Sequence, residues 1–354
     1  MEPFADRLLA WYDRHARILP WRVGPVARQQ GVLPDPYHVW LSEVMLQQTA
    51  VATVGPYFDK FVNKWPRIED LAAADTEDVM KAWAGLGYYS RARNLKACAD
   101  KVAAEYGGKF PKTATELQKL PGIGPYTSAA IAAIAFGERT AVVDGNIERV
   151  STRFTANSTP LPQAKEDCRR FMDEVTPSER PGDFVQAMMD LGATICTPRR
   201  PACSLCPVNE DCQARINQNA EAYPVKAPKK VKPTRVGAAY VAHRQDGSIW
   251  LVKRPDKGLL GGMTGVPTTN WTASQDGATG PDAGPAAVDW ANCGTIRHTF
   301  THFHLELEVW SAEIDQVAGA GWWSKPDQIA EEALPTVMKK VITAFAEELL
   351  KVPA

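Results

Sequence analysis

The sequence lacks long hydrophobic runs and any sign of an export signal. No stretch approaches the roughly eighteen consecutive apolar residues of a transmembrane helix. The first residues, MEPFADRLLAWYDRHARILPW, show no basic flank followed by an uninterrupted apolar segment, so we do not expect a secretory signal. We therefore predict a cytoplasmic protein.

The sequence also lacks a net charge that would indicate its partner. Its 354 residues include 40 basic and 41 acidic side chains, for a net charge of −1. A nucleic-acid partner thus gains no support from composition and must be argued from local motifs. Hydrophobic residues at 45% and charged residues at 23% exclude a disordered or collagen-like chain and indicate a globular protein of two or three domains.

The spacing of apolar residues changes along the chain. Spacings of three and four from residue 4 to about 215 predict helices, with a loop at 23–36. Alternation at 236–242, 248–253 and 303–311 predicts strands, followed by a closing helix at 335–350. We therefore predict an all-α domain at 1–223 and an α+β domain at 236–354. Between them, residues 224–235 hold three prolines and five basic residues, which indicates a linker, either a solvated tether or a strap that contacts phosphates.

Four of the seven cysteines crowd into residues 196–212 with the spacing C-x6-C-x2-C-x5-C. An odd number with one tight cluster is not the even, spread set of a disulfide framework. Four thiolates in one short loop can hold either a zinc ion or an iron–sulfur cluster. Only one C-x2-C knuckle is present, whereas zinc ribbons usually pair two, so the iron–sulfur cluster is favoured. No flavin or nicotinamide motif accompanies the loop, so we expect a structural rather than an electron-carrying role.

A second motif, Leu-Pro-Gly-Ile-Gly at 120–124, lies between two predicted helices within residues 113–136. Two glycines in a tight turn before a helix leave backbone N–H groups free to bind a phosphate. The pattern resembles the helix–hairpin–helix DNA-binding motif. A turn shaped only by helix packing is the alternative.

The third motif is Asp144, which follows two valines at the predicted start of a helix. An aspartate there is ordinarily an N-cap. The order of hairpin, Val-Asp and cysteine cluster, however, resembles the endonuclease III-like DNA glycosylases. The stretches WLSEVMLQQT (40–49) and GLGYYSRARNL (85–95) are similar to the adenine DNA glycosylase (MutY) branch of that group. The resemblance covers nearly all of the first domain and, weakly, the second.

The resemblance implies an all-α helix–hairpin–helix glycosylase domain with a 4Fe–4S cluster loop, followed by an α+β Nudix-like domain. In such enzymes Glu43 would be the general acid that protonates nitrogen 7 of a flipped adenine. Its helix is otherwise apolar, so we expect burial to raise its pKa, although a surface position remains the alternative. Asp144 would stay ionised beside the sugar, with its pKa lowered by the helix N-terminus. Tyr126 stands where strand-cleaving relatives have a Schiff-base lysine, which implies a monofunctional enzyme.

The resemblance also assigns the remaining site residues. Tyr126 and Asn146 would orient the catalytic groups, and Gln48 and Tyr88 would wedge into the base stack. The adenine pocket would be lined by Leu46, Leu86, Trp21 and Arg22. The DNA backbone would be contacted by Gly122, Gly124, Arg91 and Arg93. The cluster would be held by Cys196, Cys203, Cys206 and Cys212. Plain packing is the alternative for Tyr88, Leu46, Leu86 and Trp21. For Tyr126 and Asn146, the alternative is a purely structural hydrogen bond.

In the second domain, Phe300, Thr301 and His302 align with the Phe-Ser-His loop that reads 8-oxoguanine. Threonine keeps the hydroxyl of serine and adds a methyl group. No R-E-x-x-E-E helix of a catalytic Nudix box is present, so pyrophosphatase activity is not expected. We also do not expect His298, His302 and His304 to form a metal site, because their strand positions fit hydrogen bonding better.

The sequence thus predicts a monomeric glycosylase that removes adenine mispaired with 8-oxoguanine, or with guanine, from double-stranded DNA in base excision repair. One alternative is a thymine mismatch glycosylase, which would share the helical half but not the second domain. The other is a non-catalytic iron–sulfur DNA-binding module, which would need neither Glu43 nor Asp144.

Overall fold

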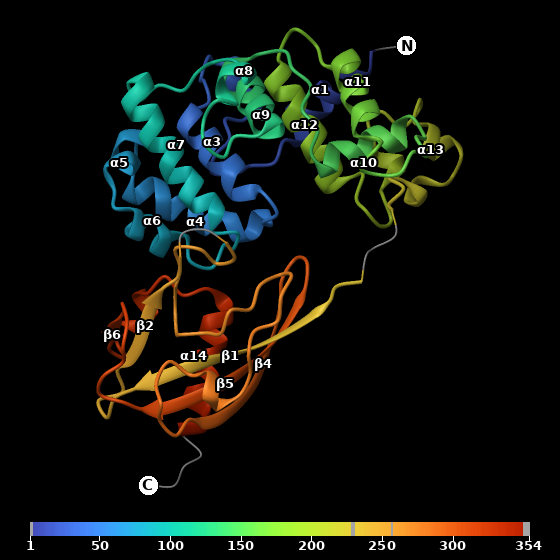
Figure 1. Cartoon of the computed structure of the whole chain (residues 1–354). Helices are drawn as coiled ribbons and strands as arrows, with labels where there is room; N and C mark the ends of the chain where they lie inside the picture. Colours follow the sequence, from blue (N-terminus) through green and yellow to red (C-terminus); the bar gives the residue numbers. More distant parts are fainter. Residues whose placement is uncertain (1–2, 228–230, 256–257, 350–354) are drawn as a thin grey trace. The chain divides into compact units, whose positions relative to one another are not determined.

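The computed structural model describes residues 3–227, 231–255 and 258–349. The chain forms two compact units, one made of Met1–Ala73 with Asn94–Lys229 and the other of Ala74–Arg93 with Lys230–Ala354 (Figure 1). Residues 228–230 of the predicted linker, and residues 256–257, lie outside the described residues. Among the residues described, no helix is long and apolar enough to span a bilayer.

The first unit is built from helices, as the three-and-four spacing predicts. Helix α7 (Ser90–Tyr106) begins in the segment assigned to the second unit and continues in the first. The other helices of the first unit are α1 (Phe4–His15), α2 (Pro25–Gln29), α3 (Pro36–Leu46), α4 (Val51–Lys64), α5 (Ile68–Ala73), α8 (Ala114–Leu117), α9 (Pro125–Phe136), α10 (Gly145–Phe154), α11 (Lys165–Val175), α12 (Pro181–Thr194) and α13 (Gln213–Ile216).

Side-chain caps fix where three of these helices begin. Asp35 accepts a hydrogen bond from the Tyr37 amide at the start of α3, and Thr113 accepts one from the Glu116 amide at α8. Asp144 caps α10 in the same way. These bonds satisfy N–H groups that have no partner inside the helix, so short polar residues at the boundary set the first turn.

Helix α9 lies at the centre of the first unit. Its residues from Thr127 to Ile134 are all buried, and it packs against α3, α8 and α12 (Figure 1). Helix α12 in turn packs against α1 and α10, and it is buried from Pro181 to Gly192. An apolar helix buried all round is a core helix. The ends of α9, α10 and α12 therefore have fixed positions, and they carry polar residues to one place.

Two segments of the first unit differ from the sequence-based expectation. The stretch 23–36, predicted to be a loop, contains the short helix α2, whose Pro25 occupies the first turn and needs no N–H partner. The predicted linker begins as part of the first unit, because the Leu161 amide donates to the carbonyl of Val225 and Leu161 bridges to Lys226. A proline-rich composition does not reveal such pairing, since one backbone bond is enough to hold a segment. The domain boundaries at 223 and 236 stay a prediction.

The second unit contains helix α6 (Thr76–Trp83) and a mixed sheet. The strands are β1 (Thr234–His243), β2 (Ile249–Lys253), β3 (Thr264–Gly265), β4 (Ala291–Thr299), β5 (His304–Glu313) and β6 (Trp322–Ser324). Their order is β3-β2-β1-β5-β4, and β6 also pairs with β2. Strands β1 and β5 run parallel in an unbroken register from Thr234 opposite His304 to His243 opposite Glu313. The predicted strands at 236–242, 248–253 and 303–311 are confirmed.

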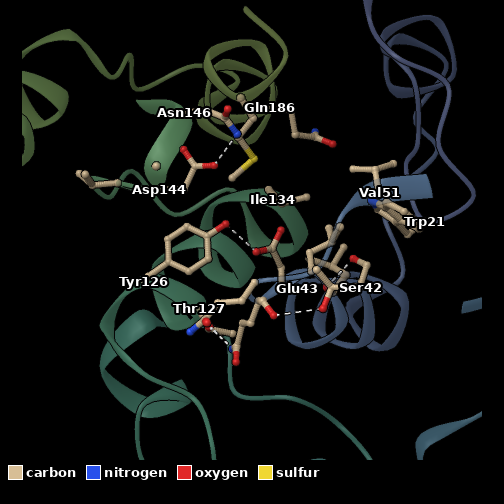
Figure 2. A pocket seen from close by; sticks show the side chains of 18 of the residues that line it. Trp21, Ser42, Glu43, Val51, Tyr126, Thr127, Ile134, Asp144, Asn146 and Gln186 are labelled. Carbon is tan, nitrogen blue, oxygen red and sulfur yellow. Dashed lines mark hydrogen bonds between the residues drawn. The ribbon is translucent and has the colours of Figure 1, made fainter. Parts of the chain in front are cut away.

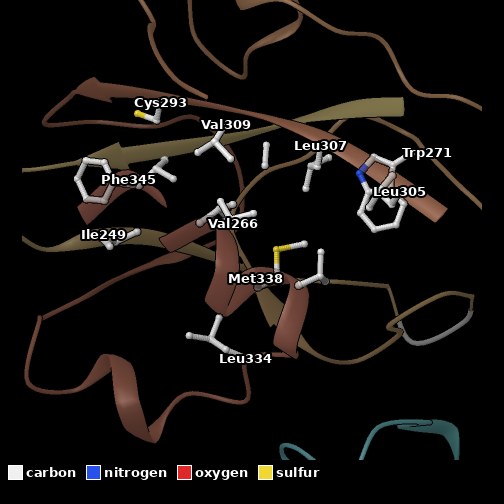
Figure 3. Close-up of a cluster of buried hydrophobic side chains, with 14 of the residues drawn as sticks. Ile249, Val266, Trp271, Cys293, Leu305, Leu307, Val309, Leu334, Met338 and Phe345 are labelled. Atoms are coloured by element: carbon white, nitrogen blue, oxygen red, sulfur yellow. The ribbon is translucent and has the colours of Figure 1, made fainter. Parts of the chain in front are cut away.

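Apolar side chains fill both faces of this sheet. On one face, helix α14 (Thr336–Leu349) places Val337, Met338, Val341 and Phe345 against Leu305, Leu307 and Val309 of β5 (Figure 3). On the other face, Tyr240, Trp250 and Trp290 form a smaller cluster. The helix predicted at 335–350 thus covers one face of the sheet.

Strand β4 was not predicted. It is an edge strand that pairs only with β5 among the described strands, and Cys293 is its one buried residue. An exposed edge needs no apolar alternation, so its sequence carries no strand pattern. Its pairing with β5 is nevertheless what places residues 300–303 in a tight connection between the two strands.

Candidate active site

A pocket of about 820 Å³ in the first unit collects most of the predicted catalytic residues. Figure 2 shows Glu43, Tyr126 and Asp144 projecting into it from α3, α9 and the start of α10. The sequence-predicted residues that line it are Trp21, Arg22, Glu43, Leu46, Gln48, Gly122, Gly124, Tyr126, Asp144 and Asn146. The fold therefore brings together residues that are more than 120 positions apart in the sequence.

Glu43 lies on α3 and is 6% exposed, so the surface position that periodicity left open is excluded. The Tyr126 hydroxyl donates a hydrogen bond of 2.8 Å to its Oε2 atom. Burial raises the pKa of Glu43 to about 7; Asp144 pushes it further up, while Tyr126 and Arg22 act in the opposite direction. The raised pKa is as the apolar helix predicts. A carboxyl with this pKa can hold a proton near neutral pH and give it up.

Asp144 is the N-cap of α10. Its Oδ1 atom accepts a 2.7 Å bond from the Ile147 amide, and its Oδ2 atom accepts a 2.9 Å bond from the Asn146 side chain. The lowered pKa that we expected at a helix N-terminus is wrong. Burial raises the pKa of Asp144, and the donors of Ile147 and Asn146 offset only part of that effect. Desolvation acts on the whole carboxylate, whereas the helix N-terminus contributes only partial charges.

The rest of the pocket wall comes from the segment after α1 and from the end of α3. Arg22 lines the pocket while its Nη1 atom donates to both oxygens of Asp190 at 2.8 Å. Gln48 has a φ of 57°, a left-handed conformation that is uncommon for a residue other than glycine. Leu86, by contrast, is not among the lining residues; it is buried in apolar packing, the alternative that the sequence left open.

The predicted hairpin connects α8 and α9. Gly122 has a φ of 74°, and a Cβ atom there would lie 2.6 Å from Cβ of Asn94, so glycine is required on two counts. Gly124 caps α9, and both glycines line the pocket. The helix–hairpin–helix geometry at 113–136 is therefore present. The contact of these amides with a DNA phosphate stays a prediction.

Arg91, predicted to contact the DNA backbone, is buried against its own chain, and that contact stays a prediction. Only 7% of it is exposed, and its guanidinium donates to the carbonyls of Leu86 and Gly87. Burial lowers its pKa to about 10. It braces the turn that carries Tyr88, which has a φ of 48° and is exposed. Arg93 is half-buried and donates to the Gly261 carbonyl in the second unit.

The cysteine loop follows α12. Among the residues described, no three His, Cys, Asp or Glu side chains are close enough to share a single metal ion. Cys196, Cys203, Cys206 and Cys212 nevertheless line one small cavity together. A 4Fe–4S cluster takes one thiolate at each of four irons, so its ligands stand farther apart than those of one ion.

The surroundings of this cavity suit a cluster of thiolates. Burial raises the pKa of the Cys206 thiol, so its thiolate form needs a cation beside it. Arg153 is fully buried at the cavity and donates to Sγ of Cys196 at 3.2 Å. Arg149 reaches the same residue, with Nε 2.7 Å from the Cys196 carbonyl oxygen. Four cysteines around one cavity, with no three among the described residues close enough to share a single ion, fit an iron–sulfur cluster.

The predicted reading loop connects β4 and β5 in the second unit. Phe300 is half-buried and stacks on Phe303, while Thr301 and His302 are exposed. The Tyr88 hydroxyl and Oγ1 of Thr301, both in the second unit, are 2.6 Å apart. Phe300 thus anchors the loop, and the two polar residues remain available to a ligand.

Sequence reasoning missed several residues of the pocket. Gln186 on α12, Arg17 after α1, and Lys165 with its partner Glu148 at 3.1 Å line the pocket. Asp190 on α12 is fully buried behind Arg17 and Arg22. A signal was present in α12, where Asp183, Gln186 and Asp190 recur at spacings of three and four in an apolar helix. Such spacing puts polar side chains on one helical face, which is unexpected for a core helix unless they have partners.

Comparisons with known families and structures agree with this site. Residues 41–177 match the HhH-GPD superfamily of base excision DNA repair proteins, residues 196–212 the iron–sulfur binding domain of endonuclease III, and residues 238–344 the NUDIX domain. The cysteine loop is thus that of a 4Fe–4S protein. The helical half resembles a thermostable thymine-DNA glycosylase with a TM-score of 0.53 and 30% identity, over 60% of this chain and 95% of that one.

Relatives that match almost the whole chain show which glycosylase family it belongs to. The adenine DNA glycosylase of Homo sapiens is 37% identical over 97% of this chain and 74% of its own length. That of Mus musculus is 36% identical over 97% of this chain and 78% of its own length. The helical fold, the pocket with two buried carboxyls and the cluster loop agree with this match. The chain therefore belongs to the adenine DNA glycosylase family, hydrolytic DNA N-glycosylases of base excision repair.

Proposed function

We propose that this adenine DNA glycosylase excises adenine paired with 8-oxoguanine, acting as a monomer and without cutting the strand. The observation that carries the chemistry is the pair of buried carboxyls, Glu43 and Asp144, in one pocket with Tyr126 bonded to Glu43. The specificity rests on the second unit, because adenine is a normal base and its selection requires a reader of the opposite base.

Glu43 supplies the proton for the leaving purine. Release of neutral adenine needs protonation, since the undamaged base leaves poorly as an anion. A pKa of about 7 keeps a large fraction of Glu43 protonated at neutral pH. The Tyr126 hydroxyl donates to Oε2, which fixes the orientation of the carboxyl and leaves Oε1 for the proton that is transferred.

Asp144 stabilises the positive charge that grows on the sugar as the bond to the base breaks. Its two oxygens are held by the Ile147 amide and the Asn146 side chain, so it does not need to reorient during the reaction. Asn146 is itself held, because Arg149 donates to its Oδ1 atom at 2.9 Å. Water then adds to the sugar carbon in place of the base and releases one proton, which replaces the proton that Glu43 gave up, so neutral adenine and the abasic sugar are the products.

Strand cleavage is not expected at position 126, because a tyrosine hydroxyl cannot form an imine with the sugar. The 4Fe–4S cluster, held by Cys196, Cys203, Cys206 and Cys212, organises the loop behind α10 and supplies no step of the hydrolysis. Gly122 and Gly124 offer backbone amides to a phosphate at the pocket rim.

Reading of 8-oxoguanine falls to Thr301 and His302. Both are exposed on a connection held by Phe300, and both can donate and accept hydrogen bonds. The Thr301 hydroxyl lies next to that of Tyr88, the residue proposed to wedge into the base stack. The wedge and the residues proposed to read 8-oxoguanine are therefore neighbours within the second unit.

The test is a single-turnover assay on a duplex with one adenine opposite 8-oxoguanine, analysed with and without alkali. Matched duplexes carry adenine opposite guanine and thymine opposite guanine. Strand breaks that appear only after alkali, and fastest for the 8-oxoguanine pair, are expected. Breaks without alkali would contradict the monofunctional assignment, and preferential release of thymine would favour the activity of the structural relative that matches the helical half.

A further inference from the structure

A buried aspartate behind the pocket wall holds two arginines in place. Asp190, on α12, is fully buried. Its Oδ1 atom accepts a bond from Nε of Arg17 at 2.5 Å, and its Oδ2 atom accepts one from the Arg17 backbone amide at 3.0 Å. Nη1 of Arg22 donates to both oxygens at 2.8 Å. Among the residues described, the bonds to this carboxylate thus come from the segment that follows α1.

This arrangement has a strong energetic reason to persist. A buried carboxylate is tolerated only when it is paired with cations and hydrogen-bonded, and removal of one partner leaves an uncompensated charge. Both arginines also line the pocket that contains Glu43. The side chain of Arg22 is 8% exposed, so solvent screens its charge little. Asp190 therefore decides where two cations stand within the active site.

The position of Arg22 matters to Glu43. The charged and titratable groups that face Glu43 are Tyr126 from α9, Asp144 at the start of α10 and Arg22 from the segment after α1. Asp144 raises the pKa of Glu43, whereas Tyr126 and Arg22 lower it. A cation that turned fully toward Glu43 would stabilise the charged carboxylate and remove the proton donor.

We propose that Asp190 is a positioning residue for base excision: it binds Arg17 and Arg22 to the pocket wall and draws the charge of Arg22 away from Glu43, which stays protonated for catalysis. This inference rests on the proposed role of Glu43 as the proton donor. Asp190 itself touches neither the base nor the sugar in this scheme. Its effect reaches the reaction through Arg22.

The test is the pH dependence of single-turnover adenine excision by Asp190→Asn. Asparagine keeps the shape of the side chain but releases Arg22 from a charged partner. The high-pH limb of the rate profile is expected to move down by about one pH unit, because an opposite charge beside a carboxyl commonly lowers its pKa by one to three units. At pH 8 the rate then falls about tenfold. If the high-pH limb of the Asp190→Asn rate profile stays at the wild-type pH, the inference is overturned.

Asp183→Asn is the matched control. Asp183 lies on the same helix, is also buried and binds Arg180 at 2.9 Å, but Arg180, unlike Arg17 and Arg22, does not line the pocket. This variant is expected to lower the melting temperature and to leave the high-pH limb in place. An equal shift in both variants would show a general effect of lost ion pairs and would overturn the positioning role.

Two further variants keep the test decisive if Asp190→Asn does not fold. Asp190→Glu retains the charge and is expected to rescue the wild-type limb. Arg22→Gln removes the cation itself and is expected to move the limb to higher pH; no movement would overturn the inference. Glu43→Gln tests the proposed function separately, and loss of excision in this variant supports Glu43 as the proton donor. If the high-pH limb of the rate profile does not move in Asp190→Asn and Arg22→Gln, only the positioning role of Asp190 is overturned.

Discussion

Burial raises the pKa of both Glu43 and Asp144, but the two carboxyls differ in their hydrogen-bond partners. Glu43 receives one donor, the Tyr126 hydroxyl, and its pKa rises to about 7. Asp144 receives a backbone amide and a side-chain amide, which oppose the rise in its pKa. A group with a raised pKa loses its charged form as the pH falls through that pKa. Excision is therefore expected to decline on the acid side when Asp144 protonates, and on the alkaline side when Glu43 loses its proton.

Asp144→Asn tests the electrostatic role directly. The amide keeps the size of the side chain and can still cap α10, but it carries no charge to stabilise the sugar cation. We expect base release in single turnover to fall by at least about a hundredfold. Duplex affinity, measured by fluorescence anisotropy, is expected to persist. Retained turnover would contradict the role given to Asp144.

At the scale of elements, α12 and the loop after it connect the pocket to the cluster. The helix places Gln186 at the pocket and Asp190 behind the pocket residues Arg17 and Arg22, and the chain reaches Cys196 two residues after the helix ends. From there, the carbonyl oxygen of Cys196 accepts a bond from Arg149, on the helix that Asp144 caps. The loop at 196–212 is thus attached to the two helices that form the catalytic end of the pocket.

Cys203→Ser removes one cluster ligand and tests this attachment. We expect the purified protein to lose its brown colour and its iron, and to bind duplex DNA at least about tenfold more weakly, because metal binding and local folding are coupled. Iron content and anisotropy measure the two effects. Cys293→Ser is the matched control, since Cys293 lies in the second unit beside the Ser311 hydroxyl and should tolerate serine with the colour unchanged. A colourless wild type that contains zinc would refute the cluster assignment.

Helices were easier to predict than strands, and the reason is physical. The long helices of the first unit carry apolar faces or cores, so their period of three to four residues shows directly in the sequence. Strand β4 has one buried residue, and strands β3 and β6 have two and three residues in all, too few to display alternation. Helix α2 has five residues and was hidden in a stretch rich in glycine and proline.

At the scale of the whole molecule, the two units divide the work. The first unit holds the hydrolytic pocket, and the second holds the loop proposed to read the opposite base. The comparisons follow the same division, because the thymine-DNA glycosylase matches 60% of the chain, whereas the adenine DNA glycosylase of Homo sapiens matches 97%. The second unit is therefore what distinguishes this chain from the thymine alternative.

Thr301→Ala combined with His302→Ala tests the reading loop. We expect the preference for adenine opposite 8-oxoguanine over adenine opposite guanine to fall about tenfold, the effect of losing one or two hydrogen bonds. The rate on the guanine pair should change little, because the hydrolytic pocket is untouched. Thr295→Ala, an exposed threonine on β4, serves as the control. An unchanged ratio would move recognition of the opposite base to another part of the chain.

The sequence by itself determined the fold class, the cysteine loop and the hairpin, because each depends on residue types at fixed local spacing. The roles of Glu43 and Asp144 were predicted from the resemblance to a known family. Tertiary structure alone decided three further matters. It buried Glu43 and Arg91 rather than exposing them, it raised the pKa of Asp144 against the helix N-terminus, and it placed Asp190 behind Arg22. Burial and long-range ion pairs depend on which elements pack together, and no local pattern records that packing.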